Sequence, residues 1–100
     1  MTVHEHRATV TAVAGAVGST TLTIPGGLCR QVLIRSTTSL ATIFRADLTD
    51  ANGTVRKNYA YHEGELNDIN PALPMAGVYT INITNASAND TFSILVGIQE

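Results

Sequence analysis

The residues of this chain that could do chemistry are few and widely separated. His4 and His6 stand two positions apart, so on a strand they would share one face and could bind a metal ion together with Glu5 or His62. A structural zinc site takes four ligands at recognisable spacing, and that spacing is absent. We therefore predict no metal site, and we keep one alternative, in which histidines of symmetry-related copies meet at an oligomer axis.

Nucleophilic catalysis and cofactor binding have no supporting motif. No serine stands in a Gly-x-Ser-x-Gly sequence, and Cys29 falls inside a predicted strand, where a cysteine is usually a small buried apolar residue. Gly26 and Gly27 follow Pro25 without a helix after them, which indicates a turn and not a phosphate cradle. We predict no catalytic residue, no cofactor and no enzymatic activity.

Two further patterns are weak. Asp47 and the segment 50–53 resemble a calcium loop, but Leu48 and Tyr59 occupy positions where the calcium-binding register requires acidic ligands. A hairpin turn explains the Asp, Asn and Gly residues. We expect Tyr59 and Tyr61 to point the same way, as a sugar-stacking pair would, but with aromatics at only 5% the pattern favours a core-facing stripe.

The composition indicates a single domain with a weakly charged surface. The chain has 100 residues, a charged fraction of 14% and a formal net charge of −2, whereas soluble domains average about 25% charged residues. This balance excludes nucleic acid and anionic membranes as electrostatic partners. A surface of Thr, Ser, Asn and Ala suits contact with another protein. No signal peptide and no apolar run of membrane-spanning length is apparent, so we expect synthesis in a cytoplasm.

The elements that must position these residues are strands, because the hydrophobic period is two and β-branched residues are frequent. The predicted strands cover residues 7–17, 20–24, 28–36, 40–48, 54–62, 78–84 and 91–98. In the third of them, we expect Val32 and Ile34 on one face, and Cys29 and Leu33 on the other. Together the strands predict an all-β fold, a single small β-sandwich of Ig-like or jelly-roll type, with seven to eight mostly antiparallel strands.

The last quarter of the chain gives the clearest local signal. Residues 78–84 and 91–98 alternate between apolar and polar, and the polar segment 85–90 separates them. This pattern predicts a β-hairpin whose apolar side chains enter one core. They are Tyr79, Ile81, Ile83, Phe92, Ile94, Val96 and Ile98.

Two segments are expected to bind partners. Residues 1–7 predict a flexible N-terminal arm, and residues 63–77 predict either a long functional loop or a short edge strand with two connections. The predicted partner-binding residues are His4, His6, Arg7, Glu63, Glu65 and Asp68. Unpaired sandwich edges further predict a homo-oligomer, either a trimer or a dimer.

Three motifs carry a family resemblance, and they lie in residues 23–34, 44–50 and 76–92. With them, the segment 22–98 resembles the small β-sandwich proteins of tailed-bacteriophage virions. Its Ala-Gly-Val-Tyr-Thr-Ile element is also similar to bacterial pre-peptidase C-terminal and Ig-like sandwiches. These motifs specify a fold and no binding residue. The resemblance implies a capsid decoration (cement) protein on the capsid surface of a virion, bound to the major capsid protein. A tail or fibre accessory protein and a carbohydrate-binding adhesion module are the alternatives.

Overall fold

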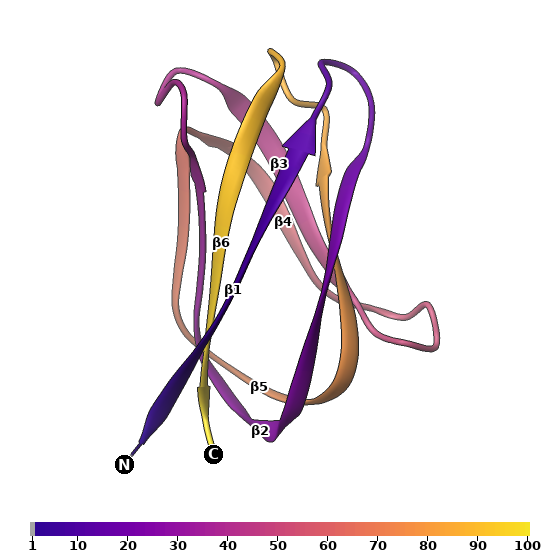
Figure 1. Ribbon diagram of the computed structural model, residues 1–100, viewed down its shortest axis with the longest axis vertical. Helices are drawn as coiled ribbons and strands as arrows, with labels where there is room; N and C mark the ends of the chain where they lie inside the picture. Colours follow the sequence, from indigo (N-terminus) through magenta and orange to yellow (C-terminus); the bar gives the residue numbers. More distant parts are fainter. Residues whose placement is uncertain (1) are drawn as a thin grey trace.

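Every regular element in the described part of the chain is a β-strand (Figure 1). The computed structural model describes residues 2–100. The strands are β1 (Val3–Ala12), β2 (Gly18–Ser36), β3 (Ile43–Thr49), β4 (Val55–Glu63), β5 (Glu65–Thr84) and β6 (Asp90–Gln99). The all-β prediction is therefore confirmed.

The strands form one antiparallel sheet in the order β1-β6-β2-β5-β3-β4. Residues 2–100 contain six strands and not the predicted seven or eight, because the predicted strands 20–24 and 28–36 are parts of the single strand β2. A sandwich of two separate sheets is likewise not confirmed, since hydrogen bonding connects all six strands. The predicted pairing of residues 40–48 with 54–62 is confirmed as β3 and β4.

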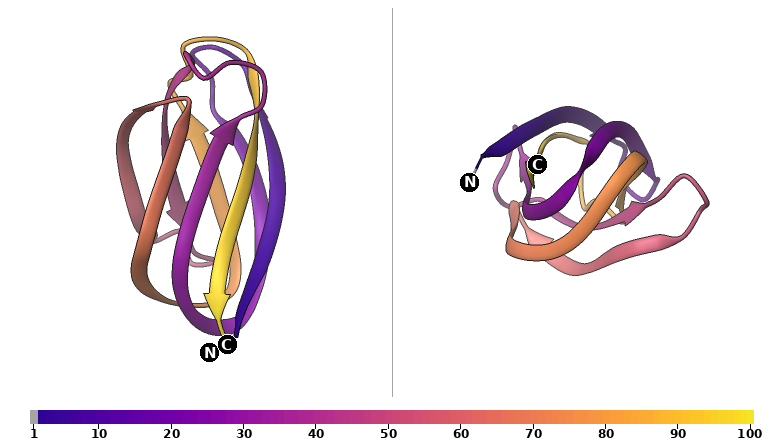
Figure 2. Two further views of the ribbon diagram at one scale, coloured as in Figure 1. Left: turned by 90° about the vertical axis from the view of Figure 1, so that its left-hand side faces the viewer. Right: turned by 90° about the horizontal axis from the view of Figure 1, so that it is seen from below.

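The sheet curls because its two longest strands bend. In β2, the register with β5 shifts between Ile24 and Gly27, where Pro25 and Gly26 interrupt the pairing. Gly27 has a φ of 152°, and a Cβ built on it would lie 2.5 Å from the carbonyl oxygen of Gln99. Glycine is therefore required at the bend. Seen from below, the strands wrap around a common interior (Figure 2).

The bends divide the sheet into two halves that enclose the core. The first half contains β1, β6, residues 27–36 of β2 and residues 65–75 of β5; the second contains residues 18–24 of β2, residues 77–84 of β5, β3 and β4. Both halves contribute to one hydrophobic cluster. At its centre the rings of Phe44 and Phe92 lie 4.7 Å apart, centroid to centroid.

The predicted C-terminal hairpin does not form, although its core residues are correct. Within the described chain, β5 pairs with β2 and β3, whereas β6 pairs with β1 and β2. Residues 85–89 therefore connect the second half of the sheet to the first. All seven predicted apolar side chains nevertheless lie in the hydrophobic cluster, because two facing surfaces bury alternate residues as effectively as two paired strands.

The two segments expected to bind partners are parts of strands. Residues 65–75 belong to β5 and pair with β2, so the predicted long loop is wrong. The alternative of a short edge strand is closer, although the strand runs on to Thr84. The expected N-terminal arm supplies residues 3–7 of β1, which pair in register with β6; Met1 lies outside the described residues. Both termini lie at the same end of the molecule (Figure 1).

Candidate functional site

The first half of the sheet presents its outward-pointing side chains on one surface, which we call the outer face. Its residues are Val3, Glu5, Arg7 and Thr9 of β1, Ser93, Leu95 and Gly97 of β6, Gln31, Leu33 and Arg35 of β2, and Glu65, Asn67 and Ile69 of β5. The left view of Figure 2 looks onto these strands, with β5, β2, β6 and β1 side by side.

The middle of the outer face is apolar. Leu95 is only 8% exposed although it points outward, and Leu33 beside it is half-buried. With Arg7 and Thr9 they line a hollow of about 410 Å³. Next to them, the missing side chain of Gly97 makes space for Val3: a Cβ on Gly97 would lie only 3.3 Å from a methyl group of Val3. Such an apolar centre is typical of protein interfaces.

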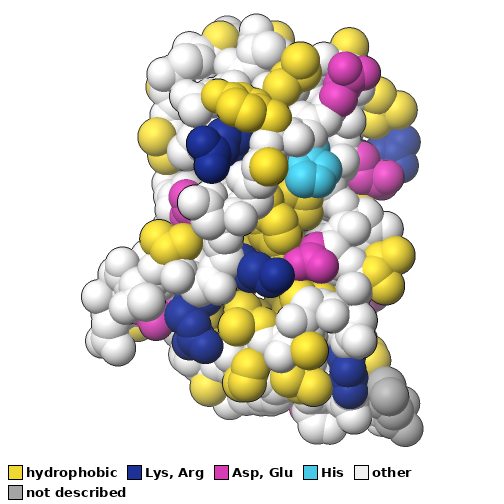
Figure 3. Space-filling view, turned by 180° about the vertical axis from the view of Figure 1, so that it is seen from behind, with side chains coloured by type: hydrophobic (Ala, Val, Ile, Leu, Met, Phe, Trp, Pro, Cys, Tyr) yellow, Lys and Arg dark blue, Asp and Glu magenta, His cyan; other side chains and the backbone are white. Residues whose placement is uncertain are grey.

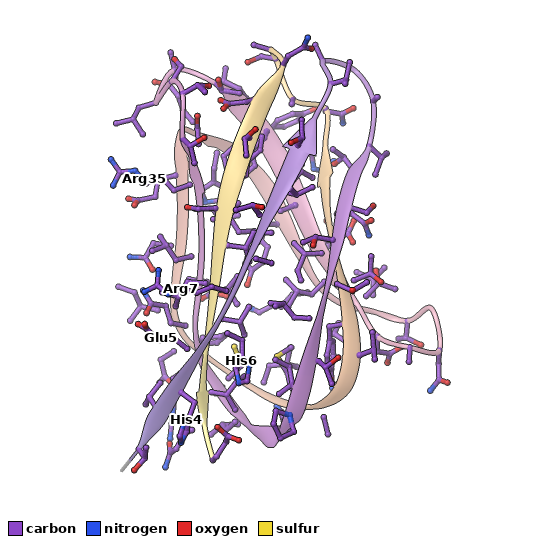
Figure 4. The ribbon with its side chains drawn as sticks, in the orientation of Figure 1. His4, Glu5, His6, Arg7 and Arg35 are labelled. Atoms are coloured by element: carbon purple, nitrogen blue, oxygen red, sulfur yellow. The ribbon has the colours of Figure 1, made fainter. Side chains whose placement is uncertain are left out.

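The charges on the outer face are paired. Arg7 Nη2 lies 2.8 Å from Glu5 Oε1 on β1, and Arg35 Nη1 lies 4.0 Å from Glu65 Oε1 between β2 and β5. In Figure 4, Glu5 and Arg7 project to the same side of β1 as Arg35. Two opposite pairs leave these four residues with no net charge, so they form a neutral polar border around the apolar centre.

The six predicted partner-binding residues do not form one site. Only Arg7 and Glu65 lie on the outer face. His4 and His6 point to the other side of β1, because neighbouring residues on a strand alternate between faces. Glu63 ends β4 opposite Ile43, and Asp68 points inward opposite Val32.

The two histidines sit at the open end of the core. His4 Nε2 lies 3.6 Å from Glu100 Oε2 at the C-terminus. His6 is half-buried opposite Val96, and its Nε2 is enclosed without a hydrogen-bond partner. Among residues 2–100, no group of three His, Cys, Asp or Glu side chains could hold a metal ion.

A second hollow, of about 270 Å³, lies between β4 and β5 and holds a polar cluster. The hydroxyl of Tyr59 donates a hydrogen bond of 2.7 Å to Asp68, and Lys57 Nζ lies 3.6 Å from the same carboxylate. Burial raises the pKa of Tyr59, and the hydrogen bond to Asp68 and its charge add to this. The rear view shows charged and hydrophobic side chains interspersed on that face of the molecule (Figure 3).

Tyr59 and Tyr61 do not form the pair that a sugar-binding platform needs. The register of β3 with β4 shifts between Phe44 and Ala46, so that Ala60 and Tyr61 both lie opposite Arg45. This bulge turns Tyr61 outward. Tyr61 is 57% exposed with the Arg45 guanidinium 5.5 Å from its ring centroid, whereas Tyr59 packs against the core.

Sequence reasoning missed a buried polar network around Asp90. Its carboxylate accepts hydrogen bonds from the hydroxyls of Ser36, Thr38 and Thr42 and from the amide of Thr91. Burial alone would raise the pKa of Asp90, but these hydrogen bonds outweigh it and lower the pKa. The one sequence signal for this network was the hydroxyl-rich segment 36–39, whose hydroxyl groups can donate hydrogen bonds to a carboxylate.

The Asp50 turn is built as predicted. Asp50 Oδ1 accepts hydrogen bonds of 3.0 Å from the amides of Asn52 and Thr54, and Gly53 has a φ of 81°. The amides engage one carboxylate oxygen of Asp50, and the other lies 3.9 Å from Arg56 Nη1, so a hairpin turn accounts for these residues.

Cys29 should be unreactive in the folded protein. It is 0% exposed, and burial raises the pKa of its thiol. Because the thiolate is the reactive species, we expect DTNB to label less than about a tenth of Cys29 under native conditions and all of it in guanidinium. Rapid native labelling would contradict this placement.

Comparisons with known proteins support the fold. No protein-family model matches the chain, and no curated protein matches it. One similar solved structure is the crystal structure of PirA, which is 17% identical and superposes with a TM-score of 0.54 over 92% of each chain. At this identity the likeness shows the fold alone. Among residues 2–100, no helix could cross a membrane.

Proposed function

We propose that the protein is a non-enzymatic structural protein of a phage particle, a capsid decoration protein that binds the major capsid protein through its outer face. The observation that carries the proposal is the apolar centre around Leu33 and Leu95 inside a border of paired charges. Surfaces with this layout bury well against another protein. The phage context comes from the sequence resemblance.

We also propose that the two halves of the curled sheet act as the facing layers of a rigid jelly-roll-type sandwich. Their inward residues share one core, so the outer face keeps its shape without a partner. A preformed face binds at a lower entropic cost than one that must first become ordered.

Of the alternatives, a tail or fibre accessory protein would use the same face and differ only in its partner. The adhesion module loses its main support, because Tyr61 is exposed alone while Tyr59 is bonded to Asp68. A lone exposed ring stacks on one sugar face only.

Leu33→Lys should weaken binding to empty capsids of the source phage at least tenfold. Leu33 lies at the centre of the outer face, and binding energy concentrates at buried central residues. The measurement is co-sedimentation of the purified protein with capsids.

Leu40→Lys is the matched control, since Leu40 is 55% exposed in the loop before β3 and lies outside the outer face. Circular dichroism of both variants checks that they are folded. Equal loss of binding in the two variants, or no loss in either, would remove the outer face from the proposal.

A further inference from the structure

The strand β1 has a free edge. It pairs with β6 on one side and, in the part of the chain described here, with no strand on the other, although Gly18 at the start of β2 lies close to the backbone of Thr11 and Ala12. Ten residues pair with β6 without a register shift, and β1 contains no proline or lysine. Proteins usually protect an edge of this length with such residues or with a bulge. The edge does carry Glu5 and Arg7, but their charges are opposite, so a regular edge of this kind is a template for a strand with complementary charges.

We propose that two copies of this chain pair antiparallel through β1, around a two-fold axis at His6. In this register Glu5 of each copy lies opposite Arg7 of the other, and the two His6 residues lie opposite each other. The sheet then continues from one copy into the next. This inference does not depend on the proposed capsid partner.

The charges on β1 select this register. Moving the axis by one residue places either Arg7 opposite Arg7 or Glu5 opposite Glu5, and directly opposed like charges destabilise a strand pair. Within one copy Arg7 Nη2 already lies 2.8 Å from Glu5 Oε1, so both side chains lie together on the outer face. Pairing the two copies adds one contact between Glu5 of one copy and Arg7 of the other on each side of the axis.

The inner side of β1 also fits the pairing. Ala8, a small residue, would lie opposite His4 of the second copy. His6 Nε2 is buried without a hydrogen-bond partner, and a neutral imidazole has one donor and one acceptor nitrogen. In the pairing, the second copy's His6 lies directly opposite, on the same inner side of the joined strands.

The pairing has a structural consequence for the outer face. A two-fold axis perpendicular to the sheet keeps both outer faces on the same side. Two apolar centres would then be presented side by side, so the dimer could engage two neighbouring copies of a partner at once, with a gain in avidity.

The test is a charge swap measured by sedimentation equilibrium of the full chain. The wild type should sediment at twice the chain mass of 10.6 kDa. Glu5→Arg and Arg7→Glu should each weaken self-association about tenfold or more, because each places like charges opposite one another on both sides of the axis. The double variant Glu5→Arg, Arg7→Glu should restore the dimer.

Arg35→Glu is the control, because Arg35 lies on the outer face away from β1 and should leave the dimer intact. A wild type that stays monomeric at its highest soluble concentration overturns the proposal, and so does any stoichiometry other than two. Failure of the double variant to recover, with its fold intact by circular dichroism, rejects the His6 register.

Discussion

Gly64→Ala should lower the free energy of unfolding by about 3–5 kcal/mol. Gly64 connects β4 to β5 with a φ of 74°, a conformation that costs about 1–2 kcal/mol for an L-residue. A Cβ there would lie 2.3 Å from the carbonyl oxygen of Leu40, which is backbone and cannot rotate away. Shifting the backbone to make room for the methyl group would also strain two hydrogen bonds of Gly64. Its amide donates to the carbonyl of Thr42 at 2.8 Å, and its carbonyl accepts from the amide of Ser36 at 2.9 Å.

Gly53→Ala is the matched control for that variant. Gly53 has a similar φ of 81°, but a Cβ on it would have no neighbour within 4 Å. It should therefore cost only the backbone strain of about 1–2 kcal/mol. Urea denaturation gives the free energy of unfolding of both variants, and the difference between their losses is the cost of the steric clash with Leu40. Equal losses would show that the backbone near Leu40 can move away from the added methyl group.

Asp90→Asn should cost about 2–3 kcal/mol at neutral pH. The carboxylate of Asp90 holds together the start of β6, the end of β2 and the loop before β3 through Ser36, Thr38 and Thr42. An amide cannot accept all of these hydrogen bonds, so at least one buried donor loses its partner. Thr42→Val, which removes a single donor and keeps its shape, should cost less.

The cost of Asp90→Asn should depend on pH in a defined direction. Hydrogen bonds lower the pKa of Asp90 in the folded protein, so the unfolded chain binds the proton more tightly. The stabilisation is fully present above the unfolded pKa of about 3.9 and is lost as the pH falls through the lower folded value. The stability difference between wild type and variant should be constant from about pH 5 to 8 and shrink below about pH 4. A difference that grows on acidification would contradict the network.

The residues that enter the core could be predicted from the sequence, but the pairing of the strands could not. Alternation placed Ile81, Ile83, Phe92 and Ile94 inside without specifying a partner strand. The predicted hairpin failed because a polar segment such as 85–89 can close a tight turn or cross between two halves of a sheet, and both satisfy the same alternation.

Two bulges explain why faces were misassigned. In β2 the register shifts between Cys29 and Gln31, which leaves Cys29 and Val32 on the same buried side. The extra residue, Arg30, is held by a hydrogen bond of 2.7 Å to Gln99. In β4 the bulge opposite Arg45 separates the two tyrosines. One inserted residue moves every later side chain of the strand to the opposite face of the sheet, and the periodicity of a single sequence does not reveal the insertion.

The outer face could be predicted only in part. Low charge pointed to protein contact, and Arg7 and Glu65 were singled out. The apolar centre was missed because Leu33 and Leu95 read as ordinary strand residues. Their neighbourhood depends on the order β1-β6-β2-β5, which brings together segments from both ends and the middle of the chain.

Electron microscopy of empty source-phage capsids incubated with the purified protein tests the central claim most directly. We expect extra density at fixed stoichiometry on the capsid surface, with the outer face, centred on Leu33 and Leu95, turned toward the major capsid protein. Density at the tail alone would contradict the decoration role. Capsid-bound density with the outer face turned to solvent would contradict the assignment of that face.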